Sequence, residues 1–287
     1  MNPFTTLIDV HTLSTLLGSE PSRLLVLDCS HELSNPSAGK QVYDAAHIPG
    51  SHFISLDDTL SGEKTGKNGR HPLPDRAALV QAMRLLGADD DTQIIAYDNG
   101  GGMYAARLWW LMRWLGHNAV AVLDGGLQAW QAAGLPCTDK APTTPQKGSF
   151  SALPPLVSTA NYADIKANLM TKRHLLIDAR GADRFRGENE TLDPIGGHIP
   201  GAINHVFRLN LDEKGLFKSP EVLRKAFESL IANRSGADVI MQCGSGVTAC
   251  HNLLAFEVAG ISGAMLYPGS WSEWCAQEGA EIAMGPE

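Results

Sequence analysis

Residues 237–248 read ADVIMQCGSGVT, an apolar run with β-branched residues that leads directly into a cysteine and two nearby glycines. Residues 249–258 follow with a pattern that is typical of a helix. A strand, a short loop and a helix in this order are the unit of a parallel sheet, where ligands bind beyond the carboxyl ends of the strands. The run therefore predicts an α/β fold and places Cys243 at a binding edge.

The setting of Cys243 favours a thiolate. The first-turn amides of a helix and its dipole stabilise negative charge, and glycines let successive amides turn toward the sulfur. A thiolate is the nucleophilic form of cysteine. We therefore expect Cys243 to be the catalytic nucleophile, in a loop formed by Gly244, Gly246, Val247 and Thr248.

The other cysteines lack this setting and are expected to be small buried hydrophobes. They are Cys29, Cys137, Cys250 and Cys275. Five cysteines without paired spacing argue against a disulfide framework and against a structural zinc site, and fit a reducing compartment. No metal and no cofactor is predicted.

Composition narrows the class of protein. The length of 287 residues suggests two domains, with one large domain as the alternative. Of these residues 44% are hydrophobic and 19% charged, as expected of an ordinary soluble globular protein. The formal net charge of −8, without a basic tract, makes a nucleic-acid partner unexpected. The N-terminus has neither a basic start nor a long apolar run, so no membrane span is expected and the cytoplasm is the predicted location.

The chain repeats itself once, because four segments recur in the same order. The pairs are 24–28 with 175–178, 46–51 with 197–202, 94–98 with 239–243, and 120–126 with 264–270. Short apolar runs alternate with helical patterns such as 76–87 and 220–231. This alternation predicts two tandem domains, each a mainly parallel sheet flanked by helices on both faces.

The domain boundary is expected in a proline-rich stretch. We assign residues 1–137 to the first domain, 138–155 to a semi-extended linker and 156–287 to the second domain. His47 and His198 occur in both halves although one half alone has a nucleophile, which favours a role in shaping a turn.

Several of these features together resemble the rhodanese family, specifically its tandem two-domain sulfurtransferases. They are the two HIPG motifs at 47–50 and 198–201, the glycine turns before Trp130 and Trp274, and a cysteine loop in the second half alone. The loop CGSGVT is similar to that of the 3-mercaptopyruvate sulfurtransferase branch. The resemblance covers essentially the whole chain and implies two rhodanese-like domains, the first of them catalytically silent because Asp98 stands in place of the thiol.

The resemblance implies a transferase that accepts sulfane sulfur from a small-molecule donor as a persulfide on Cys243. The sulfur then passes to a thiol such as thioredoxin or a small thiol, or to cyanide. With 3-mercaptopyruvate as donor, pyruvate leaves as its enolate and needs a proton. The resemblance implies Ser245, His71 and Asp57 as the relay that supplies it.

A carboxylate donor also calls for a cation, and arginine suits a planar carboxylate. The resemblance implies Arg184 as the substrate-binding arginine. The 3-mercaptopyruvate branch usually carries a second arginine just before its HIPG motif, whereas residues 190–196 contain none here. Our hypothesis is that Arg186 substitutes for it.

Three other functions compete with this interpretation. A thiosulfate sulfurtransferase would use the same cysteine but favours basic residues where this chain has Gly244 and Ser245. A cysteine phosphatase needs an arginine at position 249, which is alanine. A non-catalytic sulfur carrier or binding protein is the third alternative.

Overall fold

The structure is a computed structural model that describes residues 2–19, 23–143 and 145–286. No helix within these ranges is both long enough and apolar enough to cross a membrane. The chain divides into two compact units. Unit 1 consists of Met1–Gly62, Pro74–Leu156 and Glu213–Phe217, and unit 2 of Glu63–Leu73, Val157–Asp212 and Lys218–Glu287.

Unit 1 is built on a parallel sheet with the strand order β1-β5-β4-β2-β3. Its strands are β1 (Leu7–Ile8), β2 (Leu24–Asp28), β3 (His52–Phe53), β4 (Gln93–Tyr97) and β5 (Val120–Leu123). Its helices are α1 (Val10–Ser19), α2 (Ala38–Ala45), α3 (Arg76–Leu85), α4 (Ala105–Trp114) and α5 (Gly126–Ala132).

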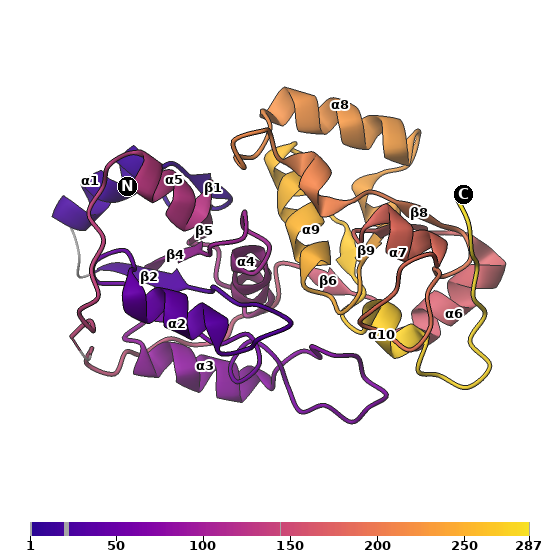
Figure 1. The fold of residues 1–287 in the computed structure, drawn as a ribbon, viewed down its shortest axis with the longest axis horizontal. Helices are drawn as coiled ribbons and strands as arrows, with labels where there is room; N and C mark the ends of the chain where they lie inside the picture. Colours follow the sequence, from indigo (N-terminus) through magenta and orange to yellow (C-terminus); the bar gives the residue numbers. More distant parts are fainter. Residues whose placement is uncertain (1, 20–22, 144, 287) are drawn as a thin grey trace. The chain divides into compact units, whose positions relative to one another are not determined.

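Helices cover both faces of the sheet in unit 1. Ile95 and Tyr97 of β4 share one buried cluster with Leu13 of α1 and Trp130 of α5. Since alternate residues of a strand point to opposite faces, Ile94 and Ala96 face the other way, where α4 packs against β4 and β5. Figure 1 shows the strands between α1 with α5 on one side and α2 with α3 on the other.

Unit 2 repeats this architecture with the strand order β6-β10-β9-β7-β8, again parallel. Its strands are β6 (Ser158–Thr159), β7 (Leu175–Asp178), β8 (Ala202–Asn204), β9 (Val239–Gln242) and β10 (Met265–Leu266). Its helices are α6 (Tyr162–Thr171), α7 (Ala182–Arg186), α8 (Pro220–Ile231), α9 (Thr248–Val258) and α10 (Ser270–Trp274), with 3-10 turns η2 (Phe207–Asn210) and η3 (Gly236–Asp238).

The core of unit 2 also has two sides. Ile240 of β9 lies in a buried cluster with Ile165 of α6 and with Trp271 and Trp274 of α10. On the other face α9 packs against β9 and β10, and α8 packs on α9 (Figure 1). The predicted α/β fold, with one parallel sheet in each half, is confirmed.

The local predictions hold because each rests on neighbouring residues. The helix expected over 76–87 is α3, which Asp75 caps by accepting from the Ala78 amide, and which Gly87 follows with a φ of +83°. The helix expected over 220–231 is α8, with Ser219 as its N-cap. The run at 237–241 forms its strand two residues later than the pattern suggests, because Gly236–Asp238 makes a 3-10 turn first.

Segment Glu63–Leu73 packs with unit 2, although the sequence assigns it to the first domain. It has no helix or strand of its own. The Arg70 amide donates to Oγ of Ser272, and the Gln277 side chain donates to the Lys67 carbonyl. These contacts join residues some two hundred positions apart, so no local pattern could predict them.

The expected linker lacks helix and strand over its described part, yet it is tied to unit 1. The Gly148 amide donates to the Arg84 carbonyl, and the Phe150 amide to the Ala88 carbonyl. The Phe150 side chain is fully buried. Asp89 accepts from both the amide and the hydroxyl of Ser149. These contacts anchor the stretch after Gln146 as part of the unit.

The two motif histidines shape equivalent turns. Nδ1 of His47 lies 2.7 Å from the Tyr43 carbonyl, and Nδ1 of His198 lies 2.9 Å from the Phe185 carbonyl. Each imidazole also stacks on the ring of the residue whose carbonyl it contacts, at 4.0 and 3.8 Å between centroids. The same construction in both units fits a structural role.

Candidate active site

The sheet ends where the cysteine loop begins. The ladder between β7 and β9 closes with the pair Asp178 and Gln242, so Cys243 is the first residue beyond the strand. The Cys243 amide donates to Oγ of Ser270 at 3.1 Å, and its carbonyl accepts from the Trp271 amide at 3.0 Å. The backbone of Cys243 is therefore fixed at both polar groups, and its side chain is 2% exposed.

Gly246 is required for the loop to close. Its φ of +75° lies in the left-handed region that favours glycine, and a Cβ there would collide with the carbonyl oxygen of Pro268. The amides of Gly244, Ser245 and Val247 have no acceptor among the described residues. Their N–H groups can therefore donate to a ligand.

The equivalent loop of unit 1 already holds an anion. Asp98 follows β4 as Cys243 follows β9, and its carbonyl accepts from the Leu127 amide. Its fully buried carboxylate accepts from the amides of four residues at 2.7 to 2.9 Å: Gly100, Gly102, Tyr104 and Ala105. A loop of this position in this fold therefore binds a negative group through main-chain amides.

Two members of the predicted relay meet. Nδ1 of His71 lies 2.7 Å from Oγ of Ser245, and both side chains are buried. His71 reaches the loop because Glu63–Leu73 is part of unit 2. Asp57 belongs to unit 1, where its carboxylate lies 3.9 Å from Nε2 of His31.

Arg184 lies at the loop. An ideal Cβ built on Gly244 would be 3.4 Å from its Nη2 atom. The guanidinium donates from Nε to Glu190 at 2.9 Å and from Nη2 to Asp193 at 3.2 Å. Arg186, two residues further along α7, forms a two-point ion pair with Glu188 at 2.7 and 2.8 Å and is about one third exposed.

Sequence reasoning did not single out Arg70. Its Nη2 atom would be 2.7 Å from the same Cβ on Gly244, and its Nη1 atom donates to Asp193. Burial raises the pKa of Asp193, although Arg70 and Arg184 both favour its charged form. The available signal was that Arg70 precedes His71, a predicted site residue.

Arg180 is a second cation that the sequence did not single out. It is 3% exposed, pairs with Asp178 at 2.6 Å and lies 4.7 Å from the centre of the Trp271 ring. Burial disfavours its charge, but Asp178, Glu190 and Cys243 outweigh burial and raise the pKa of Arg180. It therefore keeps a permanent positive charge within electrostatic reach of the sulfur.

Two of the remaining cysteines have properties unlike those of a nucleophile. Burial, together with Asp28 and Asp98, raises the pKa of the Cys29 thiol well above its usual range. Burial raises the pKa of Cys275 to about 11. All five cysteines are free thiols, and among the described residues no group of three or more His, Cys, Asp or Glu side chains could hold a metal ion.

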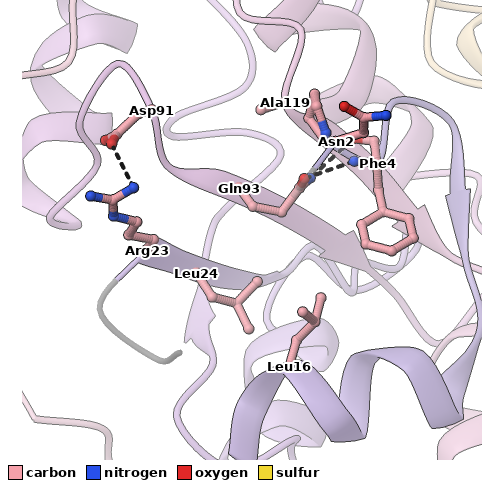
Figure 2. Close-up of a pocket in the computed structure, with 9 residues that line it drawn as sticks. Asn2, Phe4, Leu16, Arg23, Leu24, Asp91, Gln93 and Ala119 are labelled. Carbon is pink, nitrogen blue, oxygen red and sulfur yellow. Dashed lines mark hydrogen bonds and ion pairs between the residues drawn. The ribbon is translucent and has the colours of Figure 1, made fainter. Parts of the chain in front are cut away.

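A cavity of about 160 Å³ in unit 1 lies apart from the predicted site residues. Figure 2 shows Phe4, Leu16 and Leu24 around it, with the Gln93 amide bonded to the Phe4 backbone. In unit 2, a cavity of about 220 Å³ is lined by residues that include Pro72 and Gly269. The second cavity therefore borders two segments: the one that carries His71, and the turn at Gly269 and Ser270, whose Ser270 hydroxyl accepts from the Cys243 amide.

Comparisons with known proteins agree with the two-domain fold described above. A family model for the rhodanese-like domain matches residues 9–133 and 161–277. The chain is 45% identical to a probable 3-mercaptopyruvate sulfurtransferase of Pseudomonas aeruginosa, over 93% of this chain and 94% of the relative. It is 35% identical to a thiosulfate sulfurtransferase of Cricetulus griseus, over 91% and 88% of the two chains.

A solved structure is also similar to this chain over most of its length. The Escherichia coli protein SseA, described with the rhodanese fold and catalytic mechanism of 3-mercaptopyruvate sulfotransferases, superposes with a TM-score of 0.78 at 30% identity. The match covers 93% of this chain and 99% of that one.

Proposed function

Because the chain belongs to the rhodanese family and is a sulfurtransferase, we propose that it takes sulfur from 3-mercaptopyruvate onto Cys243 and releases pyruvate. The observation that carries the proposal is the loop of amides after β9, whose counterpart in unit 1 holds the Asp98 carboxylate. The same amides can stabilise a thiolate and then a persulfide.

The first half-reaction forms a persulfide. The Cys243 thiolate attacks the donor sulfur, an S–S bond forms, and the C–S bond breaks with its electron pair moving to carbon. One proton completes the step: Cys-S⁻ + HS-CH₂-CO-COO⁻ + H⁺ gives Cys-S-SH + CH₃-CO-COO⁻. In the second half-reaction an acceptor thiolate or cyanide attacks the outer sulfur and the Cys243 thiolate leaves.

The proton comes through Ser245 and His71. Oγ of Ser245 lies 2.7 Å from Nδ1 of His71, which is hydrogen-bond distance for proton transfer. Histidine titrates near neutrality and can supply this proton at physiological pH. We keep Asp57 as the proposed third member of the relay.

Thiosulfate is the second candidate donor, and one observation favours it. The sequence places no basic residue after Cys243, yet the guanidinium groups of Arg70 and Arg184 lie beside Gly244. With this donor, Cys-S⁻ + S-SO₃²⁻ gives Cys-S-S⁻ + SO₃²⁻, a step that needs no proton.

The deciding experiment compares the two donors on the same enzyme. We expect kcat/KM for 3-mercaptopyruvate to exceed that for thiosulfate, and intact-mass spectra to show one added sulfur atom on Cys243 that dithiothreitol removes. A kcat/KM that favours thiosulfate by orders of magnitude would establish the second candidate. Absence of the adduct with both donors would exclude the persulfide.

His71→Ala is expected to slow pyruvate formation by roughly 100-fold or more, because positioned acid catalysis contributes about that much. Transfer from thiosulfate should change far less, since sulfite leaves without a proton. Stopped-flow measurement of persulfide formation with each donor checks this, and His11→Ala, an exposed histidine of α1, serves as the control. Equal losses with both donors would mean that His71 only supports the loop.

A further inference from the structure

We propose that Arg180 is a positioning residue for the nucleophile: a buried, permanent positive charge that keeps Cys243 ionised in the loop of unit 2. The inference rests on the proposed function, in which the Cys243 thiolate attacks the donor, and adds the residue that makes the thiolate form. Three observations carry it: the place of Arg180 beside the loop, the bonds that fix its guanidinium, and the residue at the equivalent place in unit 1.

Arg180 lies at the same edge of the sheet as the nucleophile. The ladder between β7 and β9 ends with the pair Asp178 and Gln242, and the Ala179 amide donates to the Gln242 carbonyl at 2.9 Å. Ala179 is therefore level with Cys243, and Arg180 follows one residue later, at the end of a strand that runs about 4.8 Å from the nucleophile's own. Burial disfavours the charge of Arg180, yet its pKa is raised, and the attraction to Cys243 is among the causes.

The guanidinium of Arg180 is held in one orientation. Its Nε atom donates to Asp178 at 3.0 Å, and its Nη2 atom donates to Asp178 at 2.6 Å and to the Gly197 carbonyl at 2.7 Å. It lies 4.7 Å from the centre of the Trp271 ring, and the Trp271 amide donates to the Cys243 carbonyl at 3.0 Å. The cation is therefore fixed beside the loop before any charge forms on the sulfur, which is what preorganised stabilisation of an anion requires.

Burial distinguishes Arg180 from the other cations near the loop. The Arg180 side chain is 1% exposed, whereas the side chains of Arg70 and Arg184 are 27% and 19% exposed. Water and salt screen an exposed charge, but a buried charge acts through a medium of lower dielectric constant. The effect of Arg180 on a neighbouring anion should therefore depend little on ionic strength.

Unit 1 carries a serine, Ser30, where unit 2 carries Arg180. The Ser30 amide donates to the Asp28 carboxyl group at 2.8 Å, as the Arg180 amide donates to the Asp178 carboxylate at 2.9 Å, so the two positions are equivalent. Burial raises the pKa of Asp28, and the charge of Asp98 raises it further. The position beside the loop is therefore a cation in the unit with the cysteine and a neutral residue in the unit with the carboxylate.

The difference between the units follows from the acidity of the two groups. A carboxylic acid is ionised at neutral pH, whereas an ordinary thiol, with a pKa of about 8.5, is ionised there to only a few per cent. A thiol therefore needs more positive charge around it than a carboxylic acid does, if both are to be anions at the same pH. Main-chain amides hold the anion in unit 1, and Arg180 adds the further charge in unit 2.

The other charged and titratable groups around the loop stay constant when residue 180 alone is changed. They are Arg70 and His71 of segment Glu63–Leu73, Arg184 of α7, Glu190 and Asp193 after it, Cys250 of α9 and Cys275 after α10. A difference in pH dependence between two residues at position 180 therefore reports on the charge at that position.

The test measures how the rate of alkylation of Cys243 by iodoacetamide depends on pH. The reagent is uncharged and reacts with the thiolate, so the rate at the Cys243 peptide, followed by mass spectrometry, reports ionisation without any sulfur donor. We expect Arg180→Gln to raise the midpoint of the profile by roughly one pH unit, which means alkylation about tenfold slower near pH 6. Arg180→Lys keeps the charge and should recover most of the shift. The control Arg224→Gln removes an exposed charge of α8 and should match wild type.

Asp178→Asn provides a second background, because Arg180→Gln alone leaves a buried carboxylate without its partner. Asp178→Asn should not raise the midpoint, since it removes the opposing charge. Adding Arg180→Gln to it should raise the midpoint by about one unit, and the difference should persist in about 1 M KCl. Equal profiles with arginine and glutamine, a shift that lysine reproduces in full, or loss of the fold in both glutamine proteins would overturn the inference.

Sulfur transfer gives a second readout, which a merely structural role would not produce. With the better of the two donors, kcat/KM of Arg180→Gln should be roughly tenfold below wild type near pH 6 and should approach wild type above about pH 9.5, where the thiolate forms without the cation. A loss of equal size at every pH would count against the inference. Failure of wild-type enzyme to form the sulfur adduct with either donor would instead refute the proposed function, and the alkylation profiles would still test Arg180.

Discussion

Cys243→Ala is expected to reduce sulfur transfer to background, a loss of roughly 10⁴-fold or more, as when other covalent enzymes lose their nucleophile. The conformation of the loop should not change, because the bonds to residue 243 come from its backbone amide and carbonyl, which alanine keeps. Steady-state assays with 3-mercaptopyruvate and with thiosulfate measure the loss, and intact-mass spectra should show no sulfur adduct.

The matched control is Cys137→Ala in unit 1, a half-buried thiol that is outside the loop. It should retain full activity and the adduct. The free energy of unfolding of the Cys243→Ala protein should lie within about 1 kcal/mol of the wild-type value, because only the sulfur atom is removed. Residual turnover of more than a per cent of wild type, with an adduct on another residue, would contradict the assignment of the nucleophile.

Asp98→Ala is expected to lower the free energy of unfolding by about 3–5 kcal/mol. The change removes a fully buried carboxylate and leaves four amides, from Gly100 to Ala105, without their acceptor. Urea unfolding, followed by fluorescence and circular dichroism, measures the loss. Asp98→Asn should also destabilise the protein, since an amide offers one acceptor oxygen where the carboxylate offers two.

Asp91→Ala is the control for charge alone, because Asp91 is about two thirds exposed and lies 3.6 Å from Arg23. It should change stability by about 0.5 kcal/mol or less. Added formate should partly restore the Asp98→Ala protein by binding the vacated amides. Equal effects of the two alanine variants, or no response to formate, would show that the amides do not depend on an anion.

Local pattern was enough to predict the architecture. The strand, loop and helix around Cys243, the glycine that follows α3, and the alternation of strands with helices in both halves follow from residues close together in the sequence. Such features depend on periodicity and on capping chemistry, which a single sequence displays.

The arrangement of charges was not predictable in the same way. Arg186 and Arg184 look alike in sequence, but Arg186 pairs with its neighbour Glu188 while Arg184 bonds to Asp193. Arg70 bonds to Asp193 from a segment more than a hundred residues earlier in the chain. Which carboxylate each arginine meets depends on tertiary packing, and no spacing rule encodes it.

The Asp98 carboxylate gives the loop of unit 1 a fixed internal anion. In unit 1 four amides bond to this carboxylate, so replacing it with an uncharged residue would leave them without an acceptor. Aspartate supplies the negative charge without a nucleophilic sulfur. The loop of unit 1 therefore needs no bound ion to satisfy its amides.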